Sequence, residues 1–103
     1  MALPVDVRKF FGHALDFAQR GEQHNAAKVL KGFGSAGVLE IVENDQGSTY
    51  RAVYTIKFRE AVFVLHVFRK KSKSGIATPK PDIDIIRERL KVAEKFSQEI
   101  RNE

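Results

Sequence analysis

Arg51, His66 and Phe68 carry side chains that could together act on RNA. An arginine binds a phosphate through two parallel hydrogen bonds and stabilises the charge that builds on a phosphoryl group in transfer. A histidine exchanges protons with hydroxyl groups near neutral pH, and a phenylalanine stacks on an unpaired base with a gain of about 1–3 kcal/mol. Three lysines follow closely and could hold neighbouring phosphates: Lys70, Lys71 and Lys73. These residue types indicate RNA binding, with proton transfer at a phosphodiester as the chemistry.

The proximity of these residues depends on a predicted hairpin. Two runs rich in β-branched and aromatic residues are separated by Arg59-Glu60: Thr49 to Phe58 and Ala61 to Phe68. If the separating pair forms a two-residue loop, Arg51 lies opposite Phe68 and diagonal to His66, within about 7–8 Å. The pair lacks the Gly or Asn of the favoured tight turns, and a three-residue loop would separate Arg51 from His66.

Alternation along the two strands divides their side chains between the two faces of the sheet. One face is apolar and is expected to lie on the core beneath the helices: Tyr50, Ala52, Tyr54, Ile56, Phe58, Ala61, Phe63, Leu65 and Val67. The other face is expected to be exposed: Arg51, Val53, Thr55, Lys57, Val62, Val64, His66, Phe68 and Lys70. The polar cluster is therefore predicted to lie at one end of an exposed sheet face.

Each of these residues also has a purely structural interpretation. His66 could be a half-buried strand histidine, and Arg51 could pair with an acidic residue of a helix. Phe68 could belong to the core under a C-terminal helix, and Lys57 is expected to be solvated. The three histidines are scattered along the chain, so the sequence predicts no metal site and no cofactor.

The remaining elements follow from hydrophobic periodicity and from turn residues. Apolar spacing predicts helices from Pro4 to Arg20 and after Pro79 and Pro81, since these prolines fit only the first turn of a helix. Asn25 to Leu30 could form a short second helix. A strand and a turn complete the order: Val38 to Glu43 and Asn44 to Ser48. The predicted order is helix, short helix, three strands, helix.

Length and composition limit the classes of protein that fit. The chain has 103 residues, 43% of them hydrophobic and 30% charged, which predicts a single globular domain over residues 1–103. The absence of cysteine excludes disulfides, cysteine-ligated zinc and thiol catalysis. No apolar run approaches the 18 residues that a membrane helix needs, and no signal-peptide pattern opens the chain. We therefore expect a cytoplasmic protein that does not bind membranes.

The positive charge is concentrated in one segment of the chain. The whole sequence has 18 Lys and Arg against 13 Asp and Glu, a net charge of +5. Residues 51–80 carry a net charge of +7, whereas the segments before and after each carry −1. Such a segment favours a polyanionic partner, with nucleic acid ahead of other anions, although a solvated surface would show the same pattern.

An ordered series of motifs resembles a known family. The motifs are Leu30-Lys31-Gly32-Phe33, Val38-Leu39-Glu40-Ile41, Tyr50-Arg51-Ala52-Val53-Tyr54, Phe63-Val64-Leu65-His66-Val67-Phe68, Lys70-Lys71-Ser72, Thr78-Pro79-Lys80 and Ile86-Arg87-Glu88-Arg89-Leu90. The series is similar to the RelE/ParE superfamily of toxins of type II toxin–antitoxin systems, in its HigB-like, phage-associated branch. The similarity covers about residues 4–94.

The resemblance implies an α+β fold in which a small antiparallel sheet is packed by N-terminal helices and a C-terminal helix. It also implies a metal-independent, ribosome-dependent mRNA endoribonuclease, or mRNA interferase, silenced by a helix-turn-helix antitoxin. In this mechanism a ribose 2′-hydroxyl attacks the adjacent phosphate. Arg51 matches the arginine that contacts that phosphate, and His66, Lys70 or Lys71 would move protons. Further contacts with RNA are expected from the other basic and aromatic residues of the segment: Lys57, Phe68, Arg69, Lys73 and Lys80.

Two features depart from the family pattern. Family members usually begin with a strand before the first helix, whereas this sequence starts almost at that helix. Either the start codon was placed late, or the sheet lacks this strand and has an open edge that could pair two copies into a homodimer. The tyrosine that some relatives use near the C-terminus is also missing. Two other functions stay open: a ParE-like toxin that poisons DNA gyrase, and an inactive phage-derived module that binds nucleic acid or protein.

Overall fold

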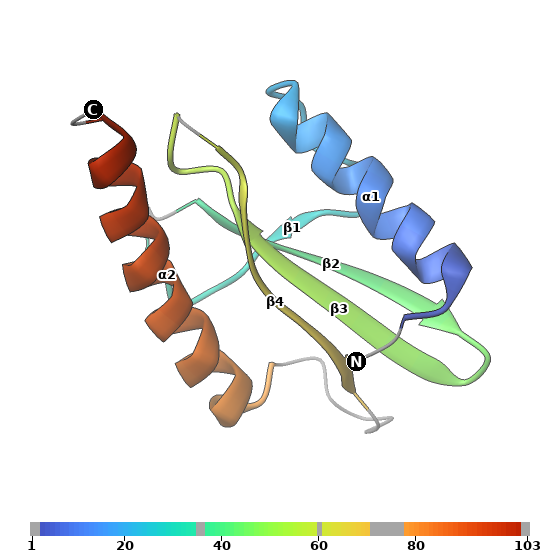
Figure 1. Cartoon of the computed structure of the whole chain (residues 1–103). Coiled ribbons are helices and arrows are strands. Elements are labelled where there is room, and N and C mark those ends of the chain that lie inside the picture. Colours follow the sequence, from blue (N-terminus) through green and yellow to red (C-terminus); the bar gives the residue numbers. More distant parts are fainter. Residues whose placement is uncertain (1–2, 35–36, 60, 71–77, 102–103) are drawn as a thin grey trace.

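A four-stranded antiparallel sheet with one helix on each face forms the fold (Figure 1). The computed structural model describes residues 3–34, 37–59, 61–70 and 78–101. The elements in chain order are α1 (Val5–Gln19), β1 (Lys28–Val29), β2 (Val38–Asp45), β3 (Ser48–Thr55), β4 (Phe63–Lys70) and α2 (Lys80–Arg101). The strands lie in the order β1-β2-β3-β4. The predicted α+β class is therefore confirmed.

The first helix forms where the apolar spacing predicts it. Helix α1 has Asp6 in its first turn, where a negative charge interacts favourably with the helix dipole. It ends before Gly21, whose φ of 80° is a conformation that glycine adopts without strain. The side chains on one face of α1 are buried against the sheet: Val7, Phe11, Ala14 and Ala18.

The predicted short helix from Asn25 to Leu30 is wrong, because this segment forms a turn followed by strand β1. A helix of six residues gains few backbone hydrogen bonds for the cost of its first turn. Pairing with β2 supplies these backbone hydrogen bonds instead. Lys28 lies opposite Glu40, and the N–H of Leu30 donates to the carbonyl of Val38 at 2.9 Å.

The turn between β2 and β3 is a tight hairpin. Its two central residues, Gln46 and Gly47, have φ angles of 47° and 81°. Positive φ at both positions gives the type of turn whose twist matches the strands of a two-residue hairpin. Asp45 consequently lies opposite Ser48, and the pairing of β2 with β3 continues without a break to Val38 opposite Thr55.

The second hairpin confirms one part of its prediction and corrects another. Arg51 lies opposite Phe68, and Val53 lies opposite His66, as expected. The strands end at Thr55 and begin at Phe63, however, so the connection is longer than two residues. A register shift between Val53 and Tyr54 pairs Tyr54 with Val64. An extra residue in one strand moves the side chains beyond it to the other face.

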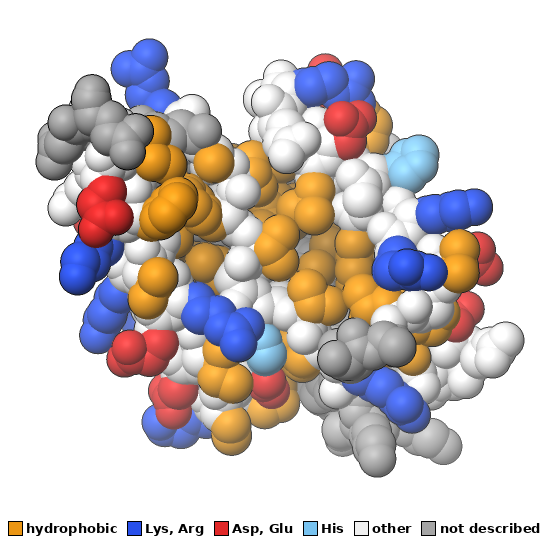
Figure 2. Space-filling view, viewed as in Figure 1, with side chains coloured by type: hydrophobic (Ala, Val, Ile, Leu, Met, Phe, Trp, Pro, Cys, Tyr) orange, Lys and Arg blue, Asp and Glu red, His pale blue; other side chains and the backbone are white. Residues whose placement is uncertain are grey.

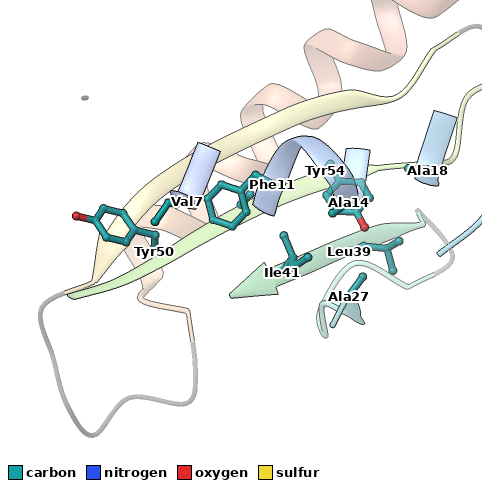
Figure 3. Packing of buried hydrophobic residues seen from close by; sticks show 10 residues of the cluster. Val7, Phe11, Ala14, Ala18, Ala27, Leu39, Ile41, Tyr50 and Tyr54 are labelled. Atoms are coloured by element: carbon teal, nitrogen blue, oxygen red, sulfur yellow. The ribbon is translucent and has the colours of Figure 1, made fainter. Parts of the chain in front are cut away.

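This register shift, a β-bulge, changes which residues form the core beneath each helix. Leu65, Phe63 and Phe58 were expected on the same face as Tyr54, and they pack on the opposite face, beneath α2. The core on the α1 side contains α1, β2 and β3 residues, among them Phe11, Ile41 and Tyr54 (Figure 3). The α2 side buries Val38, Val53, Leu65, Phe68, Ile86 and Ala93.

The expectation that the second sheet face is exposed is wrong. Helix α2 covers it, and Arg51 and Phe68 are 5% and 8% exposed. The physical reason lies in α2 itself, whose apolar stripe buries Ile86 and Ala93 and needs an apolar surface to pack on. The helix begins one residue after Pro79 and has Pro81 in its first turn, as the prolines predict.

Candidate functional site

Arg51 forms a buried polar cluster on the α2 side of the sheet. Its Nη1 donates to Glu40 Oε2 at 3.1 Å and to Thr78 Oγ1 at 3.5 Å. The Thr78 hydroxyl in turn donates to Glu40 Oε2 at 3.1 Å. The side chains of Arg51 and Glu40 are only 6% and 15% exposed. Arg51 thus pairs with a strand carboxylate, whereas one structural interpretation had placed its acidic partner on a helix.

Because Arg51 is buried, the stability of the fold depends on its ion pair with Glu40. Two charges taken out of water lose solvation that only their mutual attraction and hydrogen bonds offset, so removing one partner costs about 3–5 kcal/mol. The cluster reaches the surface through a cavity of about 430 Å³. Residues in and just after β1, in β2, and just before and within the start of α2 line it: Lys28, Val29, Leu30, Lys31, Glu40, Thr78 and Ile83.

His66 forms a second polar cluster, nearer to the surface. Its Nε2 lies 2.8 Å from Asp82 Oδ1, and its Nδ1 lies 3.3 Å from Arg89 Nη1. A carboxylate only accepts and a guanidinium only donates. Both contacts are therefore hydrogen bonds at once only when Nε2 carries the proton and Nδ1 accepts, which is the neutral imidazole with its tautomer set by Asp82.

Other contacts fix the histidine ring and the arginine. The ring stacks on Phe68, with 4.7 Å between centroids and an interplanar angle of 17°. Arg89 also donates to the carbonyl of Leu65 at 2.9 Å. The side chain of His66 is 11% exposed, whereas Arg89 is exposed. An exposed donor thus covers the basic nitrogen of a well-oriented histidine.

The start of α2 joins the two clusters. Thr78 lies two residues before the helix, and Asp82 is in its first turn. Both hold sheet residues, Arg51 in one case and His66 in the other. The position of this helix start therefore decides whether the polar groups of the sheet face are covered.

The other predicted site residues lie in different places. Lys57 follows β3 and its ammonium is over the ring of Phe58, 5.6 Å from the centroid. Arg69 is exposed and lies opposite Tyr50, so it projects from the α1 side of the sheet. Lys80 is exposed and pairs with Asp84 at 3.2 Å.

The lysines after β4 are only partly covered by the structure. Lys70 is the last residue of β4 and lies opposite Thr49, at the Arg51 end of the sheet. Lys71 and Lys73 lie outside the described residues. Their predicted roles stay predictions.

Sequence reasoning missed four residues that complete the clusters: Glu40, Thr78, Asp82 and Arg89. A signal was available for Glu40, whose position between Val38 and Val42 on a predicted strand puts it on the buried side. The contacts of Asp82 and Arg89 depend on how α2 crosses the sheet, which periodicity does not indicate.

The described residues form neither a metal site nor a membrane-spanning helix. Among them, no group of three His, Asp or Glu side chains could hold a metal ion. None of the described helices is long and apolar enough to cross a membrane. Burial raises the pKa of the Tyr54 phenol, but this side chain lies in the core under α1.

Comparison with known proteins places the chain in a family. Neither a curated protein nor a solved structure matches it at significant similarity. The family model described as "Phage derived protein Gp49-like (DUF891)" matches residues 1–91, which includes the whole sheet and the first half of α2. The chain therefore belongs to the Gp49-like family of phage-derived proteins.

Proposed function

We propose that this Gp49-like protein is the toxin of a type II toxin–antitoxin system and acts as a ribosome-dependent mRNA endoribonuclease. The motif series that resembles RelE/HigB toxins supports the toxin assignment. The observation that carries the chemistry is His66, held by Asp82 on one nitrogen and by the exposed Arg89 on the other. A histidine in a defined tautomer beside an exposed arginine suits proton transfer at a phosphodiester.

In the proposed reaction, a phosphate of the message draws the Arg89 guanidinium away from His66. The freed Nδ1 accepts the proton of the ribose 2′-hydroxyl, and Asp82 stabilises the imidazolium that forms. The 2′-oxygen bonds to the adjacent phosphorus while the bond from phosphorus to the next 5′-oxygen breaks. A lysine of the Lys70-Lys71 pair gives that oxygen its proton. The products are a 2′,3′-cyclic phosphate and a 5′-hydroxyl.

In this proposal Arg51 does not contact the phosphate unless the start of α2 moves. With its side chain 6% exposed, it meets a phosphate only after Thr78 withdraws. In the closed arrangement Arg51 is a positioning residue, which holds Thr78 and through it the segment leading to Asp82. Phe68 positions the His66 ring by stacking, and the predicted RNA contacts of Lys57, Arg69, Lys73 and Lys80 remain part of the proposal.

The test is to induce the protein in a bacterium and to map mRNA 5′ ends within minutes. Wild type is expected to create new ends at fixed codon positions of translated messages. Because the proposed leaving group is a 5′-hydroxyl, these ends enter the sequencing library only after treatment with polynucleotide kinase. His66→Gln is expected to abolish them, since glutamine takes no proton.

The matched control is His13→Gln, which changes an exposed histidine of α1 and should leave cleavage unchanged. Circular dichroism shows whether both variants fold. Growth arrest with intact messages would overturn the ribonuclease and favour a gyrase poison. Cleavage that survives in a folded His66→Gln variant would overturn the role of this histidine alone.

The proposed partners are the ribosome with its mRNA and a cognate helix-turn-helix antitoxin. Co-expression with the product of a neighbouring gene of that class is expected to restore growth. A neighbouring gene that leaves the arrest unchanged would contradict the antitoxin assignment.

A further inference from the structure

Strand β4 lies at one edge of the sheet and pairs, among the strands that the structure describes, only with β3. Its eight residues, Phe63–Lys70, carry backbone N–H and C=O groups that can pair with another extended chain, apart from the Leu65 carbonyl, which accepts a hydrogen bond from Arg89. Such an edge is a template for a further strand unless it is covered or blunted.

Apolar side chains border this edge. Val64 of β4 is 48% exposed, and Val92 and Phe96 of α2 are 66% and 52% exposed. They line a groove of about 370 Å³ between β4 and α2. Figure 2 shows hydrophobic side chains gathered on the surface between the two helices, on the side of the molecule where β4 lies. Large exposed side chains clustered beside an open edge indicate a binding surface.

The charge at this surface selects the kind of partner. Arg89 is the one charged side chain among the described residues that line the groove, and it lies against the strand because it donates to the Leu65 carbonyl. A second copy of this chain would bring another net charge of +5 and a second Arg89 to the same edge. An acidic segment, in contrast, complements it.

We propose that the β4 edge binds an extended segment of a partner protein, which adds a fifth strand to the sheet. Side chains alternate along a strand, so every second residue of the segment faces the groove. These residues are apolar where they meet Phe63, Val92 and Phe96, and one is a carboxylate that reaches Arg89. Main-chain hydrogen bonds give such strand addition its affinity, and the side-chain groove gives it specificity.

The probe is a synthetic peptide of eight residues in which valine and threonine alternate, with one central valine replaced by glutamate. Titrated into the ¹⁵N-labelled protein, it is expected to shift the amide signals of β4 and of Arg89, Val92 and Phe96. Phe96→Ser should weaken binding about tenfold, because one apolar anchor in a strand groove is worth about 1.4 kcal/mol. Val5→Ser is the matched control, since Val5 is 53% exposed on α1.

Two further measurements separate the parts of the proposal. A peptide with the same side chains but N-methylated at alternate residues should not bind, because it cannot form the ladder. Replacing its glutamate with glutamine should weaken binding to wild type but not to Arg89→Gln. Shifts that lie elsewhere, or binding that N-methylation leaves intact, would overturn strand addition. A dimer in light scattering whose interface is the β4 edge would overturn the acidic partner. None of these outcomes depends on RNA cleavage.

Discussion

The two faces of the sheet bury cores of different chemistry. Under α1, the described core consists of aliphatic and aromatic side chains, with the phenol of Tyr54 wholly buried. Under α2, a second apolar core is accompanied by the Arg51–Glu40 ion pair and the hydrogen bond between His66 and Asp82. Polar clusters cost solvation that apolar packing does not. Helix α1 therefore mainly stabilises the fold, whereas α2 covers polar side chains that are suited to acid–base chemistry.

The largest expected effect on stability comes from removing one partner of the ion pair on the α2 face. Glu40→Ala leaves the Arg51 charge buried without its carboxylate, and should lower the free energy of unfolding by about 3–5 kcal/mol. Urea denaturation measures the change. The double variant Arg51→Met with Glu40→Leu should recover most of the loss, because it removes both charges. A loss below about 1 kcal/mol in Glu40→Ala would mean that the pair is solvated.

On the α1 face, Leu39→Ala should lower the free energy of unfolding by about 3.5 kcal/mol, the middle of the range for a buried leucine. Leu39 is 3% exposed in the core under α1. The cause here is a lost apolar contact and a cavity, with no charge involved. The loss should therefore stay constant with added salt, and a salt-dependent loss would contradict a purely apolar core.

A smaller effect is expected from Asp82→Ala, which removes the acceptor of His66 at the start of α2. A hydrogen bond to a charged group contributes about 1.5–3 kcal/mol, and partial exposure of Asp82 places the loss near the lower figure. Thermal unfolding checks the value. Unchanged stability would mean that the His66–Asp82 contact does not hold α2 on the sheet.

Tyr54→Phe should have the smallest effect and the opposite sign. The Tyr54 hydroxyl is buried with no hydrogen-bond partner among the described residues, so its removal should raise the free energy of unfolding by about 1 kcal/mol. The raised pKa of this phenol means that the unfolded chain ionises first. Wild type should therefore lose stability above about pH 10 more steeply than Tyr54→Phe, and equal slopes would contradict that shift.

The elements that follow from local sequence patterns could be predicted. The apolar spacing in α1, the prolines before α2 and the turn residues between β2 and β3 each act within a few positions of the chain. The pairing of Arg51 with Phe68 agrees with the prediction, but the two-residue loop from which it was predicted does not form, and the strands reach this register only beyond the shift between Val53 and Tyr54. The predicted short helix failed because its backbone bonds are made with β2, a tertiary contact that local propensity does not include.

The environment of the site could not be predicted from the same patterns. One extra residue at the bulge near Val53 reverses the face of Leu65 and Phe63, and no turn signal marks it. The second sheet face looked exposed because α2 was assumed to pack elsewhere. Once α2 lies on that face, Arg51 is buried and His66 gains Asp82 and Arg89 as partners. Long-range packing, and not residue type, decides these contacts.

The most direct test of the division between the two faces compares Asp82→Ala with Leu39→Ala in a purified translation reaction. Both variants are assayed at a temperature where circular dichroism shows them folded. We predict that Asp82→Ala lowers the rate of mRNA cleavage at least about tenfold, because an oriented general base contributes about 10²–10⁴-fold. Leu39→Ala should cleave at the wild-type rate despite its greater loss of stability. Equal rates in the two variants, or no cleavage by wild type, would contradict the assignment of the chemistry to the α2 face.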